Sequence, residues 1–334
     1  MMRALADPRR RIRRRRVVSS MEICVVNSPA AVRVAPPLLV VLAMLTVYVV
    51  WGSTYLAIRF ALEGYPPLFF PALRFLVAGS ILYLFLRLRG HAAPSLRQWG
   101  NAALIGVLLL NVGNGGVVIA ERSVGSALAA TAVATVPLWA AVFAGIWGNW
   151  PVRLQWLGMV IGFVGIVVLN LGGDFAASPG AAMLLMLASA TWAFGSVWSR
   201  KLELPKGLMS SACQMLAAGV VFIVGSALRG ESWALLPNAK AAGALLYLIV
   251  FGSLLAFSAY MYLVQNVTPS LATSYAYVNP VVALLFGLTL GGEHIVSSGY
   301  VAIALVLFGV ALIVYYNRPA TPPVAAVKTV EADA

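Results

Sequence analysis

The sequence predicts an all-α polytopic membrane protein whose ten transmembrane helices form two five-helix repeats of inverted topology. Three observations lead to this prediction. The chain has 334 residues, of which 61% are hydrophobic and only 10% are charged. Apolar stretches of spanning length follow one another along it, and short phrases of its first half recur in its second half. A composition this apolar excludes a soluble domain, because the polar surface of one could not be built from it.

Ten apolar stretches are long enough to span a membrane. A spanning helix needs about 20 mostly apolar residues to cross roughly 30 Å of hydrocarbon. We expect spans near 36–58, 67–87, 98–120, 126–147, 154–171, 179–199, 207–228, 240–264, 270–290 and 298–316. The connections are too short to hold a soluble domain. The first repeat is therefore expected at 36–171 and the second at 179–316, after a basic disordered leader at 1–35 and before a tail at 317–334.

Recurring phrases relate the two halves. Residues 127–137 read ALAATAVATVP, and residues 270–280 read SLATSYAYVNP. Weaker echoes at nearly the same offset pair Gly52-Ser53 with Gly195-Ser196, and residues 74–79 with 214–219. Since each half holds five helices, an odd number, the second half must enter the membrane from the opposite side. Such inverted repeats are typical of secondary transporters.

The net charge of +13 is explained by the membrane and excludes nucleic acid as the partner. With the N-terminus in the cytoplasm, the connections on that side hold Arg87, Arg89, Arg97, Arg153, Arg200, Lys201 and Lys206, and the opposite connections hold only Arg59, Arg122, Arg229 and Lys240. This positive-inside bias predicts that both termini are cytoplasmic and that the lipid bilayer is the partner.

The leader allows several interpretations, because eight arginines crowd between Arg3 and Arg16. A disordered cytoplasmic segment, or an upstream start ahead of a true start near Met21, is favoured over a polybasic contact with anionic lipid. An organellar transit peptide is a minor alternative. A secretory signal is excluded, since no short apolar run with a small-residue cleavage site follows directly. Cys24 and Cys213 are too few for a disulfide framework.

Two prolines, Pro137 and Pro280, fall near the middle of the fourth and ninth expected spans. Each removes a backbone N–H and frees the carbonyl four residues earlier, on Val133 and Ala276. A free carbonyl at membrane depth must face protein or a wet cavity. The prolines are therefore predicted hinges beside a substrate site at the bilayer midplane. Two kinks without a ligand role are the alternative.

Polar and aromatic side chains inside the spans predict the lining of that cavity. Aromatic walls with few polar points suit an amphipathic organic ligand. The expected substrate contacts are Trp51, Asn111, Asn114, Trp192, Tyr260, Tyr277 and Asn279. Hydrogen bonding between helices is the simpler explanation for any single Ser or Thr. Arg74 could bind a substrate carboxylate, but snorkelling outward to pair with Glu63 or with free carbonyls is favoured. Gly158, Gly162 and Gly165 predict close helix packing.

Several kinds of chemistry lack their residues. No Asp or Glu lies in the middle of a span, so the usual device for proton-coupled cation extrusion is missing. Coupling to a proton gradient is expected to be mild or to use a rim group such as Glu121. His91 and His294 have no matching ligand set, so neither a metal site nor a cofactor is expected. Without an activated nucleophile or an acid–base pair, the chain is not expected to be an enzyme.

The spans also carry phrases of a known family. These are Trp-Gly-Ser-Thr-Tyr at 51–55, Ala-Leu-Ile-Gly at 103–106, Val-Gly-Asn-Gly at 112–115, Trp-Ala-Phe-Gly-Ser at 192–196 and Ser-Tyr-Ala-Tyr-Val-Asn-Pro-Val-Val-Ala at 274–283. Over 36–316 the chain resembles the drug/metabolite transporter superfamily, in its ten-helix branch of paired EamA domains, and in particular the YedA-type exporters of bacterial inner membranes. It departs from them at the leader.

The resemblance implies a basket of ten helices around a central cavity, with alternating access. It implies a secondary transporter that exports small amphipathic metabolites, such as amino acids or drugs, across the bacterial inner membrane. An importer or facilitator of sugars or nucleosides on the same fold is the second interpretation. A non-transporting membrane scaffold or sensor is the third, and the duplication argues against it. The implied partners are a small-molecule substrate and lipid, and a homodimer is left open.

Overall fold

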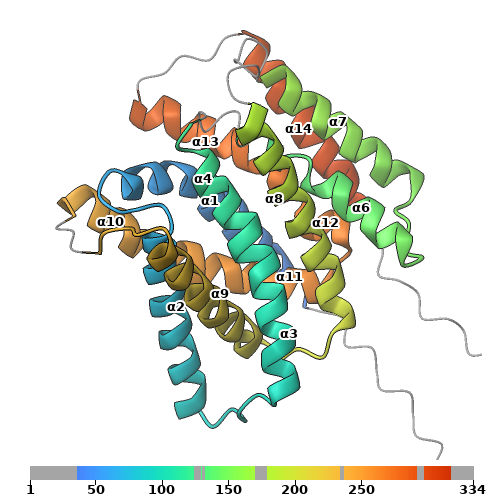
Figure 1. Cartoon of the computed structure of the whole chain (residues 1–334). Helices are drawn as coiled ribbons and strands as arrows, with labels where there is room; N and C mark the ends of the chain where they lie inside the picture. Colours follow the sequence, from blue (N-terminus) through green and yellow to red (C-terminus); the bar gives the residue numbers. More distant parts are fainter. Residues whose placement is uncertain are drawn as a thin grey trace, which may run out of the picture. The chain divides into compact units, whose positions relative to one another are not determined.

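The computed structural model describes residues 36–123, 129, 132–169, 179–233, 237–291 and 297–316, which belong to a compact unit that begins at Ala35. Within these ranges the regular structure is helical and no strand occurs, which confirms the all-α prediction (Figure 1). The expected leader lies outside the described residues, as does the tail from 317 onward. Six of the described helices are long and apolar enough to cross a membrane: Pro37–Leu62, Phe69–Leu88, Leu96–Ala120, Pro179–Lys201, Leu208–Leu228 and Ala239–Asn266. Shorter apolar helices occupy Val136–Ile146, Arg153–Val168 and Tyr300–Tyr315.

Helices α1 (Pro37–Leu62) and α2 (Phe69–Leu88) are joined by a short turn. The first N–H groups of a helix have no partner within it. At α2 they are satisfied from a distant part of the chain, because the Glu231 carboxylate accepts hydrogen bonds from the backbone N–H of Leu68 at 3.2 Å and of Phe69 at 2.9 Å. Ser226 donates to the same carboxylate at 2.7 Å. The loop after α9 therefore fixes where α2 begins.

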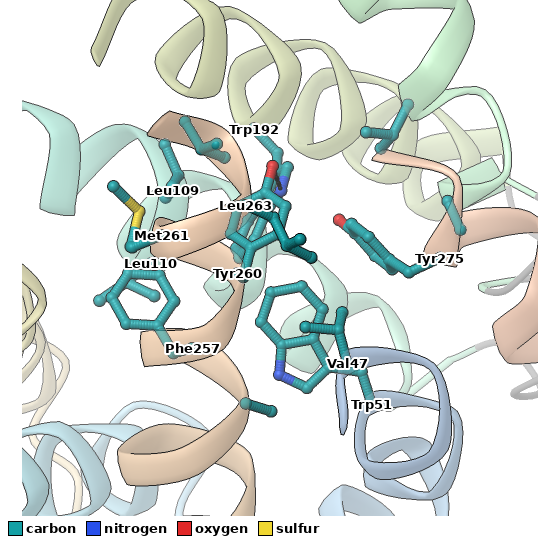
Figure 2. Close-up of a cluster of buried hydrophobic side chains, with 14 of the residues drawn as sticks. Val47, Trp51, Leu109, Leu110, Trp192, Phe257, Tyr260, Met261, Leu263 and Tyr275 are labelled. Atoms are coloured by element: carbon teal, nitrogen blue, oxygen red, sulfur yellow. Dashed lines mark hydrogen bonds between the residues drawn. The ribbon is translucent and has the colours of Figure 1, made fainter. Parts of the chain in front are cut away.

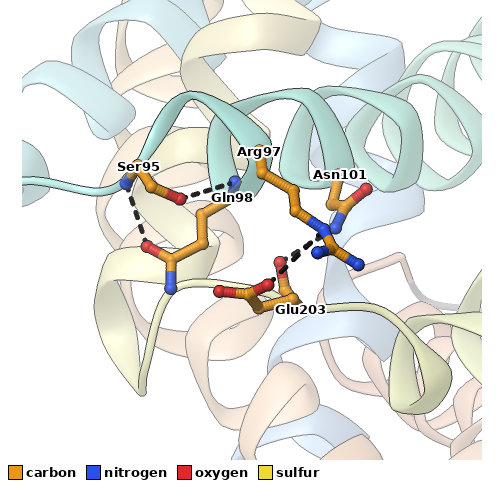
Figure 3. Close-up of polar contacts among 5 residues, drawn as sticks. All are labelled: Ser95, Arg97, Gln98, Asn101 and Glu203. Atoms are coloured by element: carbon orange, nitrogen blue, oxygen red, sulfur yellow. Dashed lines mark hydrogen bonds and ion pairs between the residues drawn. The ribbon is translucent and has the colours of Figure 1, made fainter.

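The span Leu96–Ala120 is continuous but changes its winding. It consists of α3 (Leu96–Gly106), the π-helix η1 (Val107–Asn114) and α4 (Gly115–Ala120). A capping box starts it, in which Ser95 and Gln98 satisfy each other's backbone N–H groups (Figure 3). Beside this cap, Arg97 lies 3.5 Å from the Glu203 carboxylate and Asn101 donates to the Glu203 carbonyl at 3.0 Å. The start of this span is thereby tied to the loop that follows α8.

The span Ala239–Asn266 is wound in the same way. It consists of α10 (Ala239–Tyr247), the π-helix η3 (Leu248–Phe257) and α11 (Ser258–Asn266). The Asn238 side chain caps its start by accepting from the Ala241 N–H at 2.7 Å. π-helical turns are rare overall, and those that occur are often found at functional sites. They interrupt the regular ladder of backbone hydrogen bonds.

The remaining helices are α6 (Val136–Ile146), α7 (Arg153–Leu169), α8 (Pro179–Trp198), the 3-10 helix η2 (Ser199–Lys201), α9 (Leu208–Leu228), α12 (Pro269–Thr273), α13 (Tyr275–Gly291) and α14 (Ser297–Tyr315). Near each of the two prolines the helix is interrupted by a turn, and each turn lies before its proline. Turns occupy 134–135 and Ser274, so Pro137 lies in the first turn of α6 and Pro280 lies inside α13. Proline is tolerated in a first turn, where its missing N–H costs nothing.

Glycines let the helices approach closely. Helix α2 packs against α9, and α7 against α14, as Figure 1 shows. A Cβ on Gly79 would lie 2.9 Å from Leu216 of α9, and one on Gly219 would lie 2.7 Å from Leu76 of α2. A Cβ on Gly158 of α7 would lie 2.7 Å from the Gly309 carbonyl oxygen of α14. The prediction that the α7 glycines serve packing is confirmed.

Candidate functional site

A cavity of about 70 Å³ lies among α1, α2, η1, α4, α6, α8, η3 and α13. A buried water needs about 10–15 Å³, so this space admits a few waters and is smaller than an amphipathic metabolite. Its described lining comprises Trp51, Thr54, Tyr55, Ile58, Arg74, Phe75, Leu110, Gly113, Asn114, Val117, Val133, Val136, Ala188, Ser189, Trp192, Gly252, Phe257, Tyr275 and Asn279. Helices from the beginning, the middle and the end of the chain meet there.

An aromatic cluster forms one wall (Figure 2). The Trp51 ring lies 5.4 Å from that of Trp192, 5.0 Å from Tyr260 and 4.8 Å from Tyr275, measured between ring centroids. Hydrogen bonds set these rings in place. Trp51 donates to the Gly252 carbonyl in η3 at 3.2 Å, and Trp192 donates to the Tyr260 hydroxyl at 2.9 Å. Rings with satisfied polar atoms make a rigid and largely apolar surface.

Arg74 is the charged residue of the described lining. Its side chain is only 3% exposed, and the favoured expectation that it would extend outward to Glu63 is wrong. Glu63 instead pairs with Lys240 at 2.8 Å. The Nε of Arg74 donates to Ser253 Oγ at 2.8 Å, while Nη1 is buried without a hydrogen-bond partner among the described residues. The guanidinium carbon lies 4.8 Å from the Phe75 ring centroid. No acidic residue is among the described residues of the lining.

Two asparagines add polar points to the lining. Asn114 Oδ1 is buried and has no hydrogen-bond partner within the described ranges. Asn279 is 2% exposed, and its amide nitrogen donates to the backbone carbonyls of Tyr48 at 3.3 Å and Tyr275 at 3.1 Å. The side chains of Asn279 and Tyr55 are also hydrogen-bonded. Asn279 thus joins α1 to α13 at the cavity, whereas the Asn114 oxygen is left for a ligand or a water.

The seven expected contact residues do not all line the cavity. Trp51, Asn114, Trp192 and Asn279 do. Asn111 donates to the Ala218 carbonyl of α9 at 3.0 Å, and Tyr260 lies behind the two tryptophans. Tyr277 is fully buried and faces α7, where a Cβ on Gly162 would lie 3.2 Å from its ring.

Other residues of the lining were not among the seven expected substrate contacts. Tyr275 lies four residues before Asn279, and Tyr55 four residues after Trp51, which places each pair on one face of its helix. That spacing was the available signal. Thr54, Phe75 and Ser189 carry no comparable signal, because isolated side chains of these types are common in any span.

Membrane-length apolar helices around a cavity with an aromatic wall define a membrane protein of the transporter class. Two stretches of the chain, 38–171 and 179–315, match the model of the EamA-like transporter family. The chain belongs to this family and is a membrane transporter, in agreement with the predicted resemblance and with the expectation that it is not an enzyme.

Relatives agree with this assignment, and a solved structure shares the fold. The uncharacterized inner membrane transporter YedA of Escherichia coli K12 is 48% identical over 288 residues, which cover 85% of this chain and 94% of YedA. The uncharacterized transporter YvbV of Bacillus subtilis is 24% identical over 268 residues, which cover 79% of this chain and 88% of YvbV. A crystal structure with 21% identity has the same fold, with a TM-score of 0.72 over 84% of this chain and 99% of the other.

Proposed function

We propose that this protein is a secondary transporter that exports small amphipathic metabolites bearing a carboxylate, by alternating access across the bacterial inner membrane. The observation that carries the proposal is Arg74, a buried cation whose Nη1 has no hydrogen-bond partner among the described residues, in a cavity with an aromatic wall. A buried charge without a counter-charge is costly, and a bound carboxylate would supply two acceptor oxygens. Amino acids and related acids combine that group with a small apolar body.

Ten helices in two inverted repeats, at 36–171 and 179–316, are part of the proposal. Helix pairs that would correspond under exchange of the halves support it. The π-helix η1 contacts α8 and α9, while η3 contacts α1 and α2. Gly79 against Leu216 is matched by Gly219 against Leu76. The π-helices η1 and η3 lie in the third and eighth expected spans, which correspond to each other in the two halves. Such equivalent elements would allow the two halves to exchange conformations, which is how inverted repeats give access to the two sides of the membrane in turn.

The small size of the cavity supports alternating access. A site that admits only a few waters must open before a metabolite can enter it. In the proposed cycle the site would widen around the substrate, and the hinges would lie at the turns before Pro137 and Pro280. The cytoplasmic location of both termini is proposed from the positive-inside bias of the connections, and the inner membrane from the similarity to the inner membrane transporter YedA. The outward direction is proposed from the resemblance of the sequence to exporters.

Import or facilitation of sugars or nucleosides is the second candidate function. The polar groups Asn114 and Asn279 would suit a neutral polyol. Arg74 argues against it, because a neutral ligand would leave the guanidinium uncompensated. A scaffold or sensor would need no cavity between the halves.

Ligand-induced stabilisation of the purified protein separates these functions, because a ligand that binds only the folded state raises the Tm. The panel is phenylalanine, phenylpropionate, phenylalaninamide, phenethylamine, glucose and uridine. We expect both carboxylates to raise the Tm, and the amide, the amine and the neutral compounds to leave it unchanged. Efflux of labelled phenylalanine from preloaded cells then tests direction. Stabilisation by glucose or uridine alone would favour the second function. If the protein binds phenylalanine but speeds its uptake into cells and not its efflux, the proposed direction of transport is wrong.

A further inference from the structure

Glu121 is a buried carboxylate that the cavity itself does not use. It directly follows α4, whose Val117 lines the cavity, and it is 9% exposed. Both carboxylate oxygens are buried and have no hydrogen-bond partner among the described residues. An ionised carboxylate in such surroundings loses its hydration without replacement, so its neutral, protonated form is favoured.

The charges around Glu121 are few. Helix α8 and η1, which pack against α4, contain no ionisable residue. Helix α1 brings Arg59 and Tyr55, one turn apart. Arg59 is exposed and attracts the carboxylate without forming an ion pair within the described part of the chain, and the neighbouring Arg122 is exposed as well. Burial raises the pKa of Glu121 to about 8, and the charge of Arg59 opposes this rise.

Tyr55 connects Glu121 to the cavity. It lies within electrostatic range of the Glu121 carboxylate, lines the cavity and is hydrogen-bonded to Asn279 of α13. Ionisation of Glu121 would therefore act on a contact that holds α1 and α13 together beside the site. In the proposed cycle, a change of charge at the end of α4 would therefore alter the contact between α1 and α13.

We propose that Glu121 is the proton-binding site that couples transport to a proton gradient. The proposal rests on the alternating-access cycle of the proposed function. In the closed state one proton is held on a carboxylate oxygen, and when the site opens to water the O–H bond breaks and the carboxylate ionises. In the proposed orientation, the proton is taken up from the outer side and released to the cytoplasm while substrate moves outward. Only the O–H bond forms and breaks.

Proton titration of the purified full chain tests the binding site without any substrate. Between pH 6 and pH 10, wild-type protein should release one proton more than Glu121→Gln does. The midpoint of this additional release should lie near pH 8. Arg59→Gln should move that midpoint upward, because the opposing cation is gone. The matched control is Glu63→Gln, which alters an exposed glutamate and should leave the midpoint in place. Gel filtration verifies that each variant is folded. An unchanged titration in a folded Glu121→Gln protein would overturn the proposal.

Transport tests the coupling. Proteoliposomes loaded with labelled phenylalanine receive an inwardly directed proton gradient, which should accelerate wild-type efflux severalfold. Glu121→Gln should lose this acceleration and keep exchange of labelled for unlabelled phenylalanine. If the variant is accelerated like the wild type, Glu121 is not the coupling site. If wild-type protein moves no phenylalanine, the proposed substrate class fails, while the titration still decides whether Glu121 binds the proton.

Discussion

Arg74 of α2 donates a hydrogen bond from its Nε to Ser253 Oγ in the π-helix η3, at 2.8 Å. This bond orients a guanidinium that is otherwise uncompensated in the described part of the cavity, and it joins the second expected span to the eighth. Under the proposed function, Arg74 would contact the substrate carboxylate directly and Ser253 would position Arg74.

Arg74→Gln should therefore abolish the stabilisation of the protein by phenylpropionate. A hydrogen bond to a charged group contributes about 1.5–3 kcal/mol, which corresponds to roughly 10-fold to 100-fold weaker binding. Arg74→Lys keeps the charge but loses the planar fork, so binding should be restored only in part. Ser253→Ala should weaken binding less than Arg74→Gln. The Kd of phenylpropionate is the measurement, and equal Kd values for wild type and Arg74→Gln would refute the carboxylate site.

The two cavity asparagines should differ in their effect on stability. Asn279→Ala removes bonds to two backbone carbonyls and to Tyr55, so the protein should lose about 1–3 kcal/mol of stability as well as transport. Asn114→Ala removes an oxygen without a described partner and should reduce transport with little change in Tm. The Tm distinguishes the two variants, and transport normalised to folded protein shows whether each one has lost activity. Normal transport by both variants would mean that the substrate does not bind in this cavity.

Glycine substitutions test the packing between α7 and α14. Gly158→Leu should lower the amount of folded protein in the membrane, because even a Cβ would lie 2.7 Å from a backbone oxygen of α14. Gly162→Leu should do the same, since its side chain would meet the Tyr277 ring. Gly100→Ala is the control within a helix, because nothing beyond the local backbone of its own helix lies within 4 Å of the added Cβ. It should be neutral or stabilise by up to about 1 kcal/mol. A well-folded, inactive Gly162→Leu protein would assign the α7 face to transport instead.

The stability of the protein should depend on pH through Glu121. Burial raises its pKa from 4.5 to about 8, with Arg59 acting in the opposite direction. The folded state therefore binds the proton more tightly than the unfolded state. Stability is highest below the unfolded pKa, falls as the pH rises from about 4.5 to about 8, and is level above. The Tm of wild-type protein should drop across this window, and that of Glu121→Gln should drop less. Parallel Tm curves for the two proteins would show that Glu121 is not buried as described.

Reporter fusions test the proposed topology. Fusions at residues 90, 150 and 203 and at the C-terminus should report the cytoplasm, and fusions at 63, 174 and 234 should report the outer side. The physical reason is the excess of Lys and Arg in the first set of connections. An external C-terminus would remove both the ten-helix count and the inverted repeat.

The sequence by itself determined the helical membrane class, the approximate bounds of the described helices and the family. The reason is that hydropathy and short phrases are local properties, and a bilayer requires each span to satisfy its own backbone. Four of its expected contact residues, Trp51, Asn114, Trp192 and Asn279, line the described cavity, because polar or aromatic side chains stand out within apolar spans.

Only the tertiary structure decided which face of each helix turns toward the cavity. The sequence pattern treated Tyr277 as a contact and Arg74 as an outward-reaching residue. The structure turns Tyr277 toward Gly162 of α7, and it encloses Arg74 beside η3. A span that is apolar all around has no moment to set its rotation about its own axis. That rotation follows from the glycine contacts and hydrogen bonds with neighbouring helices, which come from distant parts of the chain.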